Sequence, residues 1–303
     1  MPQIPLTLRQ FNGIIFADGQ KSQKKLFCPL NTKENDDIVV TNMLDAKKIE
    51  ALLSEKGMTV PEITYYPLTD STNERAKIYA LEHPYDGDTR VFIADEQTAG
   101  RGRRGRSFVS KCGAGIYISI LTHPKGSGFD ATRITAKAAV ALARATDSLA
   151  GVRCDIKWVN DIYLGGKKLA GILVEGAMRD DGKLPYIIVG MGINVYKNAI
   201  SEEISDIATS IEGETNIRVD RSELAANIVS EFLRATDVLS EEEAFLDYRS
   251  RSFIIGREVT VMKLSESYKA QVLDLNPDYS LLLKKENGEI ESLFTGEVSL
   301  RLK

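Results

Sequence analysis

Apolar residues recur along the chain with two different spacings, which together predict an α+β protein. Apolar residues at helical spacing predict helices at 43–56, 134–149, 224–239 and 242–251. Ser71-Thr72-Asn73-Glu74 matches the capping-box pattern, which predicts a further helix at 71–82. Short apolar runs between turn residues predict strands at 11–17, 63–67, 91–94, 115–121, 156–158, 163–164, 169–174 and 186–195. The pair Gly165-Gly166 predicts a tight hairpin between two of these strands.

The pattern changes after Arg257 to short strands without helices. These are predicted at 259–264, 270–273, 281–284 and 290–294, and Asn287-Gly288 is typical of a type I′ turn between the last two. We therefore expect an N-terminal extension at 1–42, a main domain at 43–252 and a small all-β module at 253–303.

Composition limits the classes of protein that the chain can belong to. A formal net charge of −4 and a pI near 5.5 argue against a general nucleic-acid-coating protein. Cys28, Cys112 and Cys154 are too few and too scattered for a disulfide framework, which indicates a reducing compartment. No apolar run reaches the roughly 20 residues of a membrane span, and no secretory signal is present. We predict a cytoplasmic protein without membrane contact and, since no Cys/His cluster has zinc spacing, without a protein-ligated metal.

Positive charge is concentrated at residues 97–106, which read Gln-Thr-Ala-Gly-Arg-Gly-Arg-Arg-Gly-Arg and are called the arginine loop below. Glycines let backbone N–H groups approach a ligand, and arginines add donors that match carboxylate and phosphate. The glycine spacing also matches a dinucleotide-binding motif, but a strand instead of a helix is predicted to follow, and the required acidic residue is missing. A Walker loop, an arginine-rich nucleic-acid segment and a solvated loop fit less well. We therefore expect a site for a compact anion or nucleotide.

Further segments with polar or glycine residues accompany the arginine loop. They are Ser71-Thr72-Asn73, Lys157-Trp158-Val159-Asn160-Asp161, residues 168–175 (Lys-Leu-Ala-Gly-Ile-Leu-Val-Glu) and Gly190-Met191-Gly192-Ile193-Asn194. Taken alone, each segment can also be explained without a function, as a helix cap, a turn or the end of a strand. In this order, together with the arginine loop, they resemble the biotin–protein ligases closely, over about residues 43–303.

The resemblance implies a fold and a reaction. The fold would be a mixed β-sheet flanked by helices, as in a class II synthetase-like catalytic domain, followed by a small SH3-like β-barrel. The biotin carboxylate would attack the α-phosphate of ATP, giving biotinyl-5′-AMP and pyrophosphate. A lysine of a biotin carboxyl carrier domain, part of a carboxylase, would then attack the mixed anhydride and release AMP.

The resemblance also implies functional residues. The catalytic residues would be Lys168, Arg101, Arg103 and Asp161. The biotin-binding residues would be Ser71, Thr72, Asn73, Gln97, Gly100, Arg101, Gly102, Arg103, Lys168 and Gly171. The ATP-binding residues would be Arg103, Arg106, Trp158, Asn160, Asn194 and Arg301, with Mg²⁺ on the phosphates. Lys168 can orient two anions, whereas Ser71 either meets the ureido group of biotin or caps its helix.

The chain departs from the family pattern in three places. Val159 replaces the usual proline and Phe108 stands where tryptophan is common, so we expect altered affinity only. Some members carry an N-terminal winged helix-turn-helix, but residues 1–42 show no pair of amphipathic helices, which predicts that the protein does not bind DNA. Two alternatives stay open: a ligase for a related acid such as lipoate, and a biotin-responsive transcriptional regulator. A homodimer is left open as well.

Overall fold

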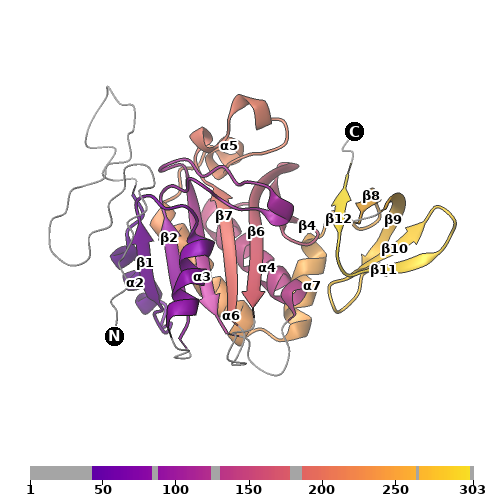
Figure 1. Cartoon of the computed structure of the whole chain (residues 1–303). Helices are drawn as coiled ribbons and strands as arrows, with labels where there is room; N and C mark the ends of the chain where they lie inside the picture. Colours follow the sequence, from indigo (N-terminus) through magenta and orange to yellow (C-terminus); the bar gives the residue numbers. More distant parts are fainter. Residues whose placement is uncertain (1–42, 84–87, 124–129, 178–185, 264–265, 301–303) are drawn as a thin grey trace, which may run out of the picture.

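The computed structural model describes residues 43–83, 88–123, 130–177, 186–263 and 266–300, which form two β-sheets and their helices (Figure 1). The predicted N-terminal extension, including its strand at 11–17, lies outside these residues. None of the described helices combines the length and apolar composition that crossing a membrane requires.

The larger sheet is mixed, as predicted. Its strands are β1 (Glu62–Tyr66), β2 (Arg90–Ala94), β3 (Gly115–Thr122), β4 (Asp155–Lys157), β5 (Asp161–Leu164), β6 (Lys167–Ala177) and β7 (Tyr186–Asn194). They are ordered β1-β2-β3-β7-β6-β5-β4; β1 and β2 run parallel and the other neighbours antiparallel. The predicted hairpin at Gly165-Gly166 joins β5 and β6, and its φ angles of 58° and 79° are those of a type I′ turn.

Helices cover both faces of this sheet (Figure 1). The main core lies on one face and is covered by α2 (Ala46–Glu55), α4 (Ala131–Ala150), α6 (Arg221–Asp237) and α7 (Glu241–Arg251). On the other face α3 (Thr72–Glu82) buries Ala76 and Ala80 against Phe92 and Ile188 of the strands. Both faces of the central strands are therefore apolar, which explains the nearly continuous apolar runs of β3 and β7. The short helix α5 (Ile211–Thr215) is absent from the sequence prediction.

The smaller sheet is antiparallel and has five strands, consistent with an SH3-like module. They are β8 (Glu258–Met262), β9 (Ser267–Leu275), β10 (Leu281–Lys285), β11 (Ile290–Leu293) and β12 (Glu297–Ser299), in the order β11-β10-β9-β8-β12. The predicted type I′ turn at Asn287-Gly288 is wrong. Gly288 has φ 87° but Asn287 is not left-handed, and the Lys285 and Gly288 N–H groups close a longer loop on Glu289 and Lys285 carbonyls. Such a loop needs only one left-handed residue.

The two sheets are joined by hydrogen bonds as well as by the chain. The Trp158 indole N–H donates to the Tyr279 carbonyl at 2.7 Å. On α7, Arg249 forms two 2.7 Å bonds to the Asp274 carboxylate of β9. Because α7 ends at Arg251 and β8 begins at Glu258, we propose the boundary between the domains at residues 252–253.

A buried ion pair ties the start of the described chain to the sheet. The Arg221 guanidinium, 2% exposed, contacts the fully buried Asp95 carboxylate and donates to the Gly115 carbonyl at 2.7 Å. Asp95 also accepts from the Tyr65 hydroxyl at 2.5 Å and from the Leu44 N–H. One carboxylate thus joins β1, the end of β2, the segment before α2 and the start of α6.

Replacing Asp95 with asparagine is expected to lower the free energy of unfolding by about 3–5 kcal/mol, because the Arg221 charge stays buried without its counter-charge. The matched control Tyr65→Phe removes one hydrogen bond and should cost about 1 kcal/mol. Urea denaturation followed by circular dichroism measures both. Equal losses in the two variants would show that the ion pair is not what Asp95 contributes.

Candidate active site

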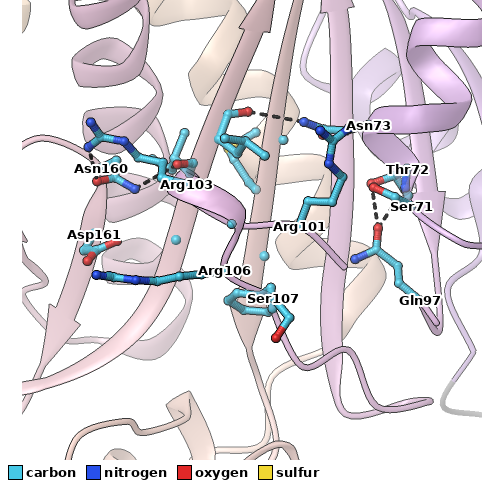
Figure 2. Close-up of a pocket in the computed structure, with 18 of the residues that line it drawn as sticks. Ser71, Thr72, Asn73, Gln97, Arg101, Arg103, Arg106, Ser107, Asn160 and Asp161 are labelled. Atoms are coloured by element: carbon cyan, nitrogen blue, oxygen red, sulfur yellow. Dashed lines mark hydrogen bonds between the residues drawn. The ribbon is translucent and has the colours of Figure 1, made fainter. Parts of the chain in front are cut away.

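One pocket gathers most of the site residues predicted from the sequence (Figure 2). It lies at the start of α3, between the arginine loop, strands β5 to β7 and the start of β12. Its wall includes the predicted residues Ser71, Thr72, Asn73, Gln97, Arg101, Gly102, Arg103, Arg106, Asn160, Asp161, Lys168 and Gly171. It also includes residues that were not assigned a role: Ser107, Phe108, Ile172, Leu173, Gly190, Met191, Gly192 and Glu297.

The arginine loop is a tight turn held by hydrogen bonds between its own backbone groups. The Gly102 N–H donates to the Arg106 carbonyl at 2.7 Å, and the Phe108 N–H donates to the Gly100 carbonyl at 2.9 Å. A Cβ on Gly100 would lie 2.3 Å from the Phe108 oxygen, so only glycine fits there. Arg104 and Gly105 are left-handed, with φ 56° and 74°. The next long element is the strand β3, which confirms that the glycines do not open a dinucleotide-binding helix.

Two arginines of the loop diverge from it (Figure 2). Arg101 pairs with Glu74 of α3 at 3.3 Å and with Glu175 of β6 at 3.2 Å. Arg103 points the other way, where it donates to Asn160 Oδ1 at 2.9 Å and contacts the Gly296 carbonyl at 3.5 Å. Burial lowers the pKa of the Arg103 guanidinium, although nearby acidic groups oppose this. Arg103 is thus a partly desolvated cation whose hydrogen-bond partners are neutral, a state that suits anion binding.

The smaller sheet holds the end of the loop through one acid. Glu297, at the start of β12, accepts from Arg106 at 2.7 Å, and Arg104 lies 3.9 Å from the same oxygen. The Arg106 side chain is 69% exposed, whereas Glu297 is 16% exposed.

Lys168 and Asp161 form an ion pair beside this group. They lie on facing strands of the β5–β6 hairpin, with 2.7 Å between Lys168 Nζ and Asp161 Oδ1. Asp161 Oδ1 is itself buried, so it meets the lysine ammonium away from solvent. The Lys168 backbone is fixed by the Ile207 carbonyl at 3.0 Å and by the Thr209 N–H at 2.9 Å.

The start of α3 presents polar groups to the pocket instead of capping itself. Ser71 is the N-cap residue, but its side chain makes no capping hydrogen bond, and Glu74 pairs with Arg101. The capping box that the sequence suggests is therefore wrong. Gln97 Oε1 takes over part of the cap, since it accepts from the Thr72 N–H at 2.8 Å. The Ser71 hydroxyl is left for a ligand.

A hydrogen-bond network fixes these polar groups. Buried Ser119 of β3 lies 2.7 Å from Thr72 Oγ1 and 2.6 Å from Asn73 Oδ1. Since one hydroxyl carries one proton, Ser119 donates to the Asn73 oxygen and accepts from Thr72. Asn73 Nδ2 in turn donates to Glu175 at 2.8 Å. Ser119 and Glu175 were not predicted as site residues.

Three glycines leave room on the face of β6 and β7. A Cβ on Gly190 would lie 2.0 Å from Asn73 Oδ1, and one on Gly192 would lie 2.7 Å from the Phe108 ring. At Gly171 the nearest atoms would be Lys168 Cε and Nζ at 3.5 Å. Gly190 and Gly192 thus admit protein groups, whereas Gly171 keeps space beside the ammonium.

Four predicted residues lie elsewhere. Trp158 is buried and bonded to Tyr279, and Asn194 donates to the Thr209 carbonyl at 3.1 Å; neither lines the pocket. The pocket placement therefore does not support their prediction as nucleotide ligands. Gly100 does not line the pocket, but its close contact with the Phe108 carbonyl shapes the loop. Arg301 is outside the described residues.

The fold and the site define a class: an α+β protein with a cationic pocket for an anionic small molecule. The Biotin/lipoate A/B protein ligase family model matches residues 65–194. The bifunctional ligase/repressor BirA of Escherichia coli is 32% identical over 266 residues, 86% of this chain and 78% of that protein. A Mycobacterium tuberculosis biotin–[acetyl-CoA-carboxylase] ligase is 31% identical over 225 residues, 72% of this chain and 81% of that protein.

Solved structures agree with the sequence comparison. The biotin protein ligase of Aquifex aeolicus, solved in complex with biotin and ATP, matches with a TM-score of 0.68 and 28% identity over 79% of this chain and 98% of that one. The chain belongs to the Biotin/lipoate A/B protein ligase family, among its biotin protein ligases.

Two glycine substitutions on neighbouring strands should have different consequences. Gly190→Ala should lower the free energy of unfolding by about 1–3 kcal/mol, because Asn73 must leave its hydrogen bonds to admit the methyl group. Gly171→Ala, the control, meets only ordinary contacts and should change it by less than about 0.5 kcal/mol. Denaturant unfolding measures both, and equal stabilities would mean that Asn73 is not held as described.

Proposed function

We infer that the protein is a biotin–[biotin carboxyl-carrier protein] ligase. It activates biotin with ATP to biotinyl-5′-AMP and transfers the biotinyl group to a lysine of a carrier domain. The observation that carries this inference is a single pocket with neutral hydrogen-bonding groups at one end and Arg103, Lys168 and Arg106 at the other. The similarity of this chain to the Aquifex aeolicus biotin protein ligase, which was solved with biotin and ATP, supports the inference.

The cationic end serves the adenylation step. A carboxylate approaching a triphosphate meets repulsion, and fixed cations in a partly dry site offset it. In this scheme Lys168, which lines the pocket, contacts both the biotin carboxylate and the α-phosphate. Arg103 and Arg106 stabilise the negative charge that grows on the leaving pyrophosphate. No covalent enzyme intermediate is needed, so Lys168 acts as an electrostatic group and not as a nucleophile.

The neutral end holds the ureido ring of biotin. The Ser71 hydroxyl, the backbone N–H groups at the start of α3 and the Thr72 and Gln97 side chains offer donors and acceptors for a cyclic urea. Gly102 and Gly171 keep room for the bicyclic ring and its chain. Asn160 holds Arg103 through a 2.9 Å hydrogen bond, which supports a role for Arg103 as the nucleotide ligand.

In the transfer step the carrier lysine attacks the acyl carbon, its N–C bond forms, and AMP leaves with the phosphate oxygen. The attacking amine must lose a proton. Asp161, whose side chain is 21% exposed, can accept it directly or through water.

Mg²⁺ accompanies ATP in this scheme. Among the residues that the structure describes, no three His, Cys, Asp or Glu side chains form a metal cluster. Mg²⁺ typically binds through one or two carboxylates together with substrate phosphates. The Asp161 carboxylate fits that role, and the ion would neutralise phosphate charge.

Two other functions have weaker support. A lipoate ligase shares the family, but the named relatives above are ligases for biotin-dependent proteins or bifunctional ligase/repressors. A DNA-binding regulator would need residues 1–42, which lie outside the described part of the chain, so the absence of DNA binding stays a prediction. A cytoplasmic location stays a prediction as well.

The part of β6 beyond its pairing with β5 offers a place for a second copy of the chain. β6 pairs with β5 as far as Gly171 but with β7 as far as Ala177. Residues 173–177 therefore have an outer edge without a strand partner in the described part of the chain. Free edges pair readily with another chain. We propose a homodimer through this edge, which sedimentation velocity distinguishes from a monomer.

Lys168→Ala should slow pyrophosphate release by about 10²–10³-fold, as expected when one preorganised electrostatic group is lost. The assay contains ATP, Mg²⁺, biotin and a carrier domain, and carrier biotinylation is read in parallel. Lys167→Ala is the matched control, because its side chain donates to the Ser205 carbonyl outside the pocket.

Wild-type turnover in Lys168→Ala would remove this lysine from the mechanism. If the unmodified protein neither releases pyrophosphate nor labels the carrier, the inferred activity itself is wrong.

A further inference from the structure

Arg101 differs from the other cations of the pocket because, within the described part of the chain, two carboxylates face it. Its Nη1 lies 3.3 Å from Glu74 Oε2 and its Nη2 lies 3.2 Å from Glu175 Oε1. One positive charge thus faces two negative charges. A phosphate or carboxylate brought to this guanidinium would be repelled by both acids, since like charges at such distances disfavour each other. Arg103, by contrast, has neutral hydrogen-bond partners.

Glu175 links two walls of the pocket. One of its oxygens faces Arg101, while the other accepts from Asn73 Nδ2 at 2.8 Å. Asn73 sits at the start of α3, where Gly190 leaves the space that it occupies. Glu74, one residue further along α3, holds Arg101 from the other side. The start of α3, strand β6 and the arginine loop therefore meet through these side chains.

We propose that Glu74 and Glu175 are positioning residues that clamp the arginine loop over the pocket through Arg101. Arg101 then serves as the anchor of the loop, and the anion is bound by Arg103 and Lys168. This revises the catalytic role that the family resemblance implies for Arg101. The proposal rests on the proposed function only where a bound adenylate is measured.

Substitutions of Glu74 and Glu175 can separate the contact with Arg101 from the contact with Asn73. Glu175→Gln keeps an oxygen that accepts from Asn73 but loses the charge that attracts Arg101. Glu74→Gln loses the other attraction and does not touch Asn73. Glu175→Ala loses both the loop contact and the Asn73 contact. Glu82→Gln, at the far end of α3, is the control for a lost charge on this helix.

Hydrogen exchange of the ligand-free protein tests the clamp without any assumption about activity. The reporters are the amides of Gly102, Arg106 and Phe108, which are bonded within the loop or at its end. We expect exchange there to rise about two- to fivefold in Glu74→Gln and Glu175→Gln, the scale of a partly exposed ion pair, and to rise further in the double variant. Glu82→Gln should match the wild type. Unchanged exchange in the double variant would overturn the clamp.

Release of preformed biotinyl-AMP tests the consequence for the ligand. A loosened loop should let it leave faster in Glu74→Gln and Glu175→Gln, with the KM for biotin unchanged, whereas Glu175→Ala should also raise that KM. The release rate of biotinyl-AMP in Arg101→Met should match that of the double glutamine variant within about twofold. Adding Glu175→Gln to Arg101→Met should not change this rate further.

The opposite pattern would identify Arg101 as an anion ligand. In that case removing either acid would slow release, because a competitor of the ligand is gone, and Arg101→Met would be far more damaging than the double glutamine variant. If no adenylate forms in the unmodified protein, the proposed function fails while the exchange experiment still decides the clamp.

Discussion

Cations gathered in a partly dry pocket repel one another and lose hydration, so each needs a partner that the fold supplies. The partners here come from different elements. Glu74 and Glu175 face Arg101, Glu297 faces Arg106, and Asp161 faces Lys168. The same pairs that make the charges tolerable therefore also fix the loop to α3, β6 and β12. The site and the packing of its surrounding elements depend on one set of ion pairs.

The space in the pocket depends on glycines in β6 and β7, which have no side chains on this face. Neighbouring strands with side chains on this face would fill it, and β6 and β7 place glycines there instead. Gly190 admits Asn73 and Gly192 admits Phe108, so these positions serve the protein's own packing. The glycine at 171 differs, because its missing side chain leaves space beside Lys168. Similar sequence motifs thus have two distinct physical purposes.

The sequence predicted most of the pocket because five segments carry recognisable residue types in a fixed order. It failed where a partner is distant in the chain or a local pattern is ambiguous. Glu297 lies 191 residues from Arg106, and no local spacing connects them. The sequence pattern at Ser71 and Glu74 predicted a capping box. In the structure the Glu74 carboxylate instead pairs with Arg101, which is distant in the chain. Glu175 could have been found, because positions 171, 173 and 175 of one strand share a face.

The smaller sheet has a part in the site that its own composition does not suggest. Its Gly296 carbonyl and Glu297 carboxylate contact the arginine loop, and its Tyr279 carbonyl holds the Trp158 indole two residues before Asn160. Asn160 in turn holds Arg103. The smaller sheet therefore reaches Arg103 by two routes, one direct and one through the segment between β4 and β5. A displacement of this sheet is therefore expected to shift Arg103 and Arg106 together. The cationic end of the pocket is thus coupled to the C-terminal module through Arg103 and Arg106, whereas Ser71 and Thr72 of the neutral end are held by the start of α3.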